Sequence, residues 1–127
     1  MERLAVCRLA SDACIPGWAM EGRFFCVVRT PEELSVVYSE DVCLGDRMPC
    51  AAPVERGWLA LKLVGPFPFS MTGVLGSFLE PLAEARIPIF AISTFDTDYV
   101  LIKRENLEQA VAALGTAGHE KVGEETV

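Results

Sequence analysis

Two short stretches of the sequence carry residue types that could bind a small charged molecule. The first, from Gly65 to Gly73, runs into an expected helix. Backbone N–H groups in the first turn of a helix lack partners and carry the positive end of the helix dipole, so they suit a carboxylate. In the second stretch, the carboxylates of Asp96 and Asp98 suit an ammonium or guanidinium group. Together the two stretches could hold a zwitterion.

In the first stretch, the N–H groups would come from Met71, Thr72, Gly73 and Val74. Gly73 would also let a ligand approach the backbone closely, because it has no side chain. The alternative is an ordinary capped helix whose glycine serves packing.

In the second stretch, Asp96 and Asp98 lie two positions apart in an expected hairpin turn, and aspartate is also a common turn former. A metal site is less favoured, because two acids supply few ligands. Ser93 and Thr94 end an expected strand, and their hydroxyls could bond a ligand or, more commonly, the backbone. Ser93 is not expected to be a nucleophile, since the only histidine, His119, falls in a predicted tail.

Aromatic residues lie near both stretches and could line the same pocket. Aromatic side chains between a sheet and helices more often belong to the core, however. The four candidates are Phe67, Phe69, Phe90 and Phe95.

Composition excludes several classes of function. The chain has 127 residues, a hydrophobic fraction of 51% and a formal charge of −7, so it can fill a core and lacks the basic footprint of a nucleic-acid-binding protein. An acid at position 2 and an arginine at position 8 interrupt any leader-like apolar core, and no apolar run is long enough to span a membrane. We therefore expect a cytoplasmic protein with no cofactor, no nucleic acid and no membrane among its partners.

The cysteines do not form a metal-binding pattern. They are odd in number and have no Cys-x-x-Cys spacing, which predicts reduced, mostly buried thiols and leaves a redox pair or disulfide as the alternative. They are Cys7, Cys14, Cys26, Cys43 and Cys50.

The second half of the chain predicts the order strand, helix, strand, strand, helix. The first helix has apolar residues at helical spacing, a candidate N-cap at Ser70 and a kink or early end at Pro81. The second helix begins at Asn106 with Gln109 as its capping-box partner, and Gly115 or Gly118 ends it. The strands are expected at Trp58–Val64, Ile87–Thr94 and Asp98–Lys103, the first helix at Ser70–Ala85, and the helical stripes at Val74, Leu75, Phe78, Leu79 and Leu82 and at Leu107, Ala110, Val111 and Leu114.

The first half matches the second in pattern. At an ungapped offset of 65, Phe24–Asp41 aligns with Ile89–Asn106, and Leu4–Leu9 resembles Leu59–Val64. The alignment puts Glu32-Glu33 in the place of Thr97-Asp98, which suggests either a second site or a solvated turn. The first half otherwise predicts a strand, a short helical turn near residues 16–20 and a hairpin.

These patterns divide the chain into a degenerate half over residues 1–56, with Glu55-Arg56-Gly57 as the joint, a complete half over residues 57–118 and a disordered tail over residues 119–127. Ile87–Ile92 is apolar on both alternating faces, so we expect both faces to be covered, one by helices and the other by the partner half or a second chain.

Residues 65–75 and 81–102, with the Ser-Thr-Phe-Asp-Thr-Asp-Tyr sequence at 93–99, resemble the ACT domain family. The form is similar to the subfamily of small bacterial tandem-ACT proteins and the ACT domains of cytosolic arginine sensors. The resemblance implies an α+β, ferredoxin-like βαββαβ-type fold and regulatory binding of an amino acid between two ACT units. It favours Asp98, because the family motif ends in an aspartate followed by an aromatic residue. Pro68, where an acidic residue is expected, and Arg86, where glycine commonly ends the helix, depart from the pattern.

The sequence thus predicts an amino-acid-binding regulatory module, a homodimer or an intrachain pseudo-dimer, that is not an enzyme. Its ligand would contact Phe69, Met71, Thr72, Gly73, Val74, Ser93, Thr94, Phe95, Asp96 and Asp98. One alternative is a partner-binding module without a ligand, which Pro68 favours. Another is a small enzyme with Asp96 or Asp98 as a base, which the lack of a suitably placed histidine opposes.

Overall fold

The computed structural model describes residues 2–42, 52–64 and 73–120. They divide into two compact units, an N-terminal unit of residues 2–57 and a C-terminal unit from residue 58 onward. The boundary falls inside a strand, β4 (Val54–Lys62), which begins before the predicted Trp58 and includes the segment expected to be a joint. Gly57 has φ +81, a conformation that glycine adopts without strain, and its N–H donates to Glu40 Oε2 at 2.7 Å.

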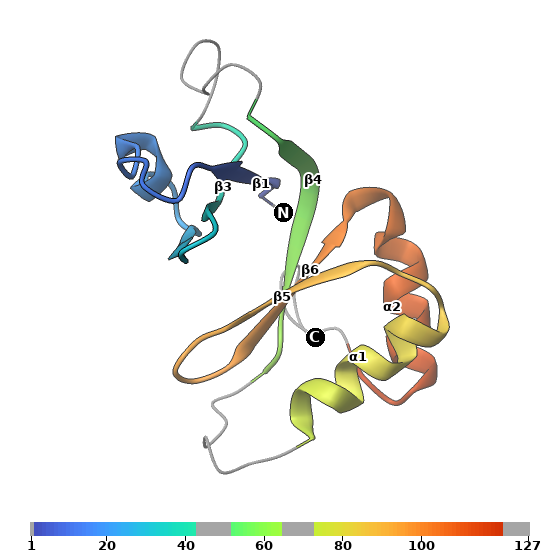
Figure 1. The fold of residues 1–127 in the computed structure, drawn as a ribbon. Helices are drawn as coiled ribbons and strands as arrows, with labels where there is room; N and C mark the ends of the chain where they lie inside the picture. Colours follow the sequence, from blue (N-terminus) through green and yellow to red (C-terminus); the bar gives the residue numbers. More distant parts are fainter. Residues whose placement is uncertain (1, 43–51, 65–72, 121–127) are drawn as a thin grey trace. The chain divides into compact units, whose positions relative to one another are not determined.

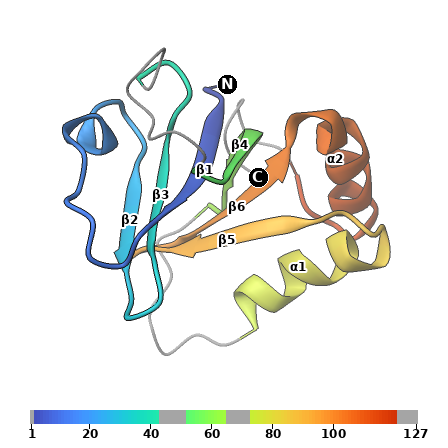
Figure 2. The ribbon, with the colours of Figure 1, turned by 45° about the horizontal axis from the view of Figure 1, so that its top comes forward.

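The C-terminal unit has the predicted order of elements. β4 pairs with β6 in antiparallel fashion, with Trp58 opposite Lys103, and β5 pairs with β6 with Ile89 opposite Ile102. Both helices pack on one face of this sheet (Figures 1 and 2). This α+β arrangement is ferredoxin-like. The remaining elements are α1 (Val74–Glu84), β5 (Ile89–Ser93), β6 (Asp98–Lys103), the 3-10 turn η3 (Arg104–Asn106) and α2 (Leu107–Thr116).

The helices and the sheet enclose one apolar core, and the predicted helical stripes supply most of it. Alternation along the strands puts every second residue of β4 and β6 on the helix-covered face. The buried members are Leu61, Leu63, Phe78, Leu82, Ile87, Val100, Ile102, Ala110 and Leu114. Within this single chain, the residues of β5 are half-buried or exposed and none is fully buried. Coverage of its second face by another chain stays a prediction.

The start of α1 differs from the prediction. Its N-cap is Gly73, in the left-handed conformation at φ +79, and the predicted cap, Ser70, lies outside the described residues. Pro81 does not end the helix early, since α1 continues to Glu84.

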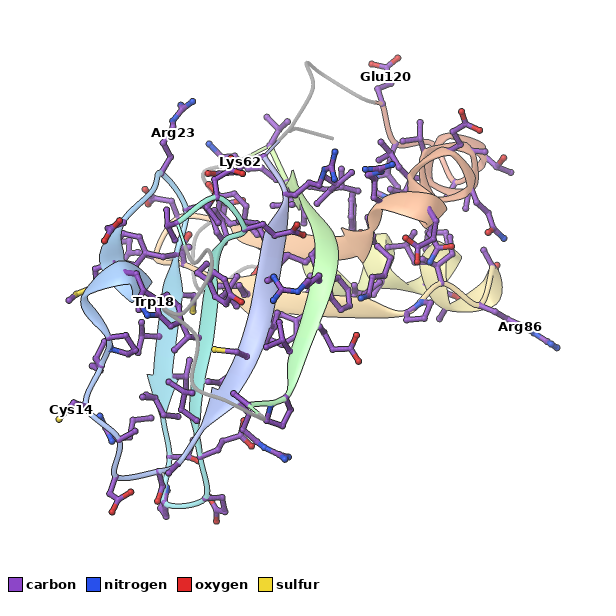
Figure 3. All side chains as sticks on the ribbon, turned by 90° about the horizontal axis from the view of Figure 1, so that it is seen from above. Cys14, Trp18, Arg23, Lys62, Arg86 and Glu120 are labelled. Carbon is purple, nitrogen blue, oxygen red and sulfur yellow. The ribbon has the colours of Figure 1, made fainter. Side chains whose placement is uncertain are left out.

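The end of α1 is closed by a residue with a strained backbone. The N–H of Ile87 donates to the carbonyl of Leu82 and the N–H of Arg86 to that of Ala83, which is the Schellman pattern. This pattern needs a left-handed residue, and Arg86 supplies it at φ +59. The Arg86 side chain extends away from the unit (Figure 3). Arg86, which stands where glycine commonly ends the helix, therefore has a locally strained backbone.

Replacing Arg86 with glycine is expected to raise the free energy of unfolding by about 1 kcal/mol. Left-handed backbone costs a non-glycine residue about 1–2 kcal/mol, and the greater flexibility of unfolded glycine offsets part of that gain. Urea denaturation measures the difference. Arg86→Ala keeps the Cβ atom and should stay within about 0.5 kcal/mol of wild type, and equal stabilisation by both variants would contradict the strain argument.

α2 begins without the predicted capping box. Asn106 occupies the N-cap position but makes no side-chain cap, because η3 directly precedes the helix. Gln109 instead donates from Nε2 to the carbonyl of Ala85 at 3.3 Å, which joins α2 to the end of α1. Gly118, at φ +98, ends the helix in a second Schellman pattern, with His119 N–H bonded to Leu114 O.

The N-terminal unit contains β1 (Leu4–Leu9), the 3-10 turn η1 (Gly17–Met20), β2 (Cys26–Arg29) and β3 (Leu34–Ser39). β3 pairs with both other strands, and η1 covers one face of the sheet with Trp18 and Ala19. Trp18 lies against the edge of the Tyr38 ring, with ring centroids 4.9 Å apart. Among the described cysteines, Cys14 and Cys26 are free thiols, and burial raises the pKa of the Cys26 thiol, which makes it less nucleophilic.

The turn hydrogen bonds show that the sequence alignment of the two halves is wrong by one residue. The N–H of Thr30 donates to Glu33 O at 2.8 Å, and the N–H of Thr94 donates to Thr97 O at 2.8 Å. Equivalent turn residues are therefore 64 positions apart, one fewer than the sequence alignment suggested. Because side chains alternate along a strand, a slip of one residue exchanges the two faces of the sheet. Asp98 thus corresponds to the buried Leu34. The alternative of a second site at Glu32-Glu33 therefore lacks an equivalent of Asp98.

Candidate functional site

The two sequence stretches are joined through the end of β4. The N–H of Leu63 donates to the carbonyl of Asp98 at 3.0 Å, and Thr97 Oγ1 donates to the carbonyl of Leu63 at 2.7 Å. The turn between β5 and β6 is therefore held beside the exit of β4. Residues 65–72, which lie outside the described residues, connect this exit to α1. The turn and the N-terminal end of α1 lie at the same end of the unit (Figures 1 and 2).

Two threonines shape the turn. Thr94 Oγ1 donates to the carbonyl of Thr97 at 3.1 Å and accepts from the N–H of Thr97 at 3.3 Å. Hydroxyl side chains commonly close turns in this way. Phe95 and Asp96 are consequently exposed at the tip, and Phe95 is 78% exposed.

Asp98 is the best-oriented carboxylate of the turn. It lies opposite Ser93 in the β5–β6 ladder, and Ser93 Oγ donates to Asp98 Oδ1 at 2.5 Å. Such a short O–H···O contact is typical of a charge-assisted hydrogen bond. The hydroxyl proton is directed at the carboxylate, so the pair presents mainly acceptor lone pairs to its surroundings. This arrangement suits a ligand with several N–H donors.

The start of α1 supplies the opposite polarity. Gly73 has no side chain with which to cap the helix, no acid lies in the first turn, and the first helical hydrogen bond runs from Ser77 N–H to Gly73 O at 2.9 Å. The N–H groups that precede this bond have no partner within the helix. They can donate to a carboxylate.

A pair of alanine substitutions separates the conformational role of Gly73 from its position in the helix. An added Cβ meets nothing within 4 Å at either Gly73 or Gly76, but Gly73 has φ +79. Gly73→Ala is expected to lower the free energy of unfolding by about 1 kcal/mol, because of the left-handed backbone. Gly76→Ala, inside α1, should raise it by about 0.5–1 kcal/mol. Urea denaturation measures both variants. If both changed the free energy of unfolding in the same direction, the conformational role of Gly73 would be contradicted.

The structure thus brings together Ser93, Thr94 and Asp98, and places Phe95 and Asp96 at the exposed tip. Gly73 and Val74 begin α1, whereas Phe69, Met71 and Thr72 lie outside the described residues. Sequence reasoning missed two residues, Thr97 and Leu63, whose hydrogen bond joins the stretches. The spacing of Thr94 and Thr97, one at each end of the turn, was the available signal.

Within the part of the chain that the structure describes, no three side chains of His, Cys, Asp or Glu gather as a metal site requires. No helix among the same residues is both long and apolar enough to cross a membrane.

Comparison with known proteins supports the fold. An Agrobacterium tumefaciens protein of known crystal structure is 39% identical, covers 95% of this chain and 87% of its own, and superposes with a TM-score of 0.81. The regulatory subunit of aspartate kinase from Thermus thermophilus is 13% identical, and the superposition covers 93% of each chain with a TM-score of 0.63, which shows the same fold.

Among curated proteins, the bovine cytosolic arginine sensor for mTORC1 subunit 1 is 25% identical over 100 residues, or 72% of this chain. The chain spans less than two thirds of the curated relatives that it matches, 57% of a human relative and 30% of the bovine sensor. A family model described as an N-terminal domain matches residues 2–50, and the ACT domain model matches residues 54–116. Through this second segment, which contains β4, both helices and the Ser93–Asp98 turn, the chain belongs to the ACT domain family.

Proposed function

We propose that this chain is a regulatory module that binds a free amino acid, and that it does so without catalysing a reaction. The observation that carries the proposal is the Ser93–Asp98 pair, held at the exit of β4 and at the same end of the unit as the uncapped start of α1. An acceptor pair and a set of N–H donors without partners inside the helix match the two charged ends of an amino acid.

In this arrangement the α-ammonium group would bind Asp98 and Ser93, and the α-carboxylate would bind the N–H groups around Gly73 and Val74. Phe95, exposed at the tip of the turn, would contact the ligand's side chain. A single-chain site or one shared between two copies would both satisfy this chemistry. The relatives support the regulatory role, since one is a cytosolic arginine sensor and another a regulatory subunit. A cytosolic location of this chain is part of the same proposal.

Binding is favoured over catalysis by the position of the only histidine. The Nε2 atom of His119 lies 3.2 Å from the carbonyl of Ser77 on α1, so the ring is engaged there, and Ser93 is bonded to Asp98 instead. A hydrolytic site needs serine, histidine and an acid in contact.

Isothermal titration calorimetry with each of the twenty amino acids tests the proposal, with L-arginine as the first probe. We expect at least one amino acid to bind with a dissociation constant below about 1 mM, the range of a useful cellular sensor. Binding should be lost with the N-acetyl derivative of the same amino acid, whose amine cannot carry a charge. Silence from all twenty would reject amino acid binding and favour the partner-binding module.

A further inference from the structure

Thr97 is buried in a turn whose neighbouring residues are exposed. It is 8% exposed, whereas Thr94, Phe95 and Asp96 all lie at the surface. Its hydroxyl does not face solvent but donates to the carbonyl of Leu63, the residue that follows β4, at 2.7 Å. A buried hydroxyl that crosses to another strand is costly to place unless it is satisfied, as this one is.

Closing the turn does not require this hydroxyl. The equivalent turn of the N-terminal unit has Glu33 in the place of Thr97, yet its backbone bond between Thr30 and Glu33 has the same length, 2.8 Å. The first threonine acts alike in both turns, since Thr30 Oγ1 accepts from Glu33 N–H at 3.1 Å and Thr94 Oγ1 accepts from Thr97 N–H at 3.3 Å. The Thr97 hydroxyl therefore has a separate task.

The hydrogen bonds of Leu63 show this task. Its carbonyl accepts from Thr97, and its N–H donates to the carbonyl of Asp98, so the last residue before β6 and the first residue of β6 are both bonded to the residue that follows β4. The Asp98 carboxylate is held from the other side by Ser93. A binding group that is fixed before its ligand arrives loses less freedom when the ligand binds.

We propose that Thr97 is a positioning residue for the amino acid site: its buried hydroxyl anchors the turn to Leu63 and thereby orients the Asp98 carboxylate. This inference rests on the proposed function, because its consequence is measured as ligand affinity.

The test compares Thr97→Val, which keeps the shape and removes the hydroxyl, with Thr97→Ser, which keeps the hydroxyl. Two readouts are taken on the full chain: hydrogen exchange of the Leu63 amide without ligand, and the affinity for L-arginine, followed by the other amino acids if L-arginine is silent. Thr97→Val should speed Leu63 exchange about tenfold, leave exchange at Ile102 unchanged and weaken binding about tenfold. Thr97→Ser should stay within about twofold of wild type in both readouts.

Two further variants serve as a substitute and as a control. Thr97→Ala removes the same hydroxyl without placing a methyl group against the Leu63 carbonyl, and it replaces the valine variant if that one does not fold. Thr116→Val removes a hydroxyl that donates to a backbone carbonyl, that of Ala112 at 3.0 Å, but on the exposed surface of α2. It should change neither readout.

Each outcome decides the inference. Unchanged Leu63 exchange in the valine and alanine variants overturns it, and so does faster exchange with unchanged affinity. If the wild-type chain binds none of the amino acids, the proposed function fails and the positioning role falls with it. If wild type and Thr97→Val bind equally well, the proposed function stands and the inference alone is wrong.

Discussion

Replacing Asp98 with alanine is expected to weaken amino acid binding about a hundredfold. The Asp98 carboxylate accepts a hydrogen bond from Ser93, and the backbone carbonyl of Asp98 accepts one from the N–H of Leu63, so both ends of the residue are held in place. Removing one member of a hydrogen-bonded charge pair commonly costs about 2–5 kcal/mol of binding free energy. About 2.7 kcal/mol corresponds to the expected hundredfold loss. Calorimetric titration with the amino acid that binds wild type measures it.

Two neighbouring substitutions serve as controls. Asp96→Ala removes the same charge from the exposed tip of the turn and should change the affinity less than about threefold, because charges there are well screened. Ser93→Ala should cost about fivefold, since it removes the group that orients the carboxylate but not the charge. Equal losses of affinity in Asp96→Ala and Asp98→Ala would show that the turn attracts the ligand by its overall charge and does not form a specific site at Asp98. An unchanged affinity of Asp98→Ala would place the ligand elsewhere.

The second large effect is expected from His119→Ala, which should lower the free energy of unfolding by about 2 kcal/mol. The ring of His119 meets the buried Phe78 edge-on, with centroids 5.2 Å apart, and its Nε2 lies 3.2 Å from the Ser77 carbonyl. A hydrogen bond contributes about 1 kcal/mol and an aromatic contact about as much again. Urea denaturation followed by circular dichroism checks this value.

Pro81 explains why that hydrogen bond matters. In a regular helix the Ser77 carbonyl would accept from the N–H of residue 81, but proline has none. His119 supplies the missing donor, which requires Nε2 to carry the proton. In the Pro81→Ala background the helix can satisfy Ser77 itself, so His119→Ala should then cost about 1 kcal/mol less. Additive effects of the two substitutions would contradict this coupling.

Local patterning predicted most of the C-terminal unit. The strand Asp98–Lys103 appears with the predicted bounds, and the apolar stripes of both helices form the core, because burial of one face is a property of spacing that the sequence displays directly. The helix starts were less predictable. Gly73 begins α1 through its backbone conformation, and Gln109 bonds to Ala85, a residue that is remote in sequence. Propensities do not report such contacts.

The correspondence between the two halves shows a similar limit. A pattern of strand, turn and strand aligns nearly as well at an offset of 65 as at 64, because both halves are rich in apolar residues. Hydrogen bonds distinguish the two offsets, and they pair Thr30 with Thr94 as first residues of the turn. At an offset of 65 Asp98 would correspond to Glu33, another acid, whereas at the observed offset of 64 it corresponds to Leu34.

The candidate site was predictable in its chemistry and less so in its construction. Ser93 and Asp98 stand out as polar residues beside an apolar strand, and they do meet. Thr97 resembles any turn threonine until the structure shows it buried against Leu63. Buried side-chain bonds to a distant backbone depend on tertiary packing, so the sequence alone did not reveal this one.

Leu34 in the place of Asp98 has a consequence for stoichiometry. A repeat that kept two equal pockets would take up two molecules per chain, and its response could steepen with concentration. Here the first half carries an aliphatic, buried residue where the second carries the acid. A titration should therefore record no more than one bound molecule per chain.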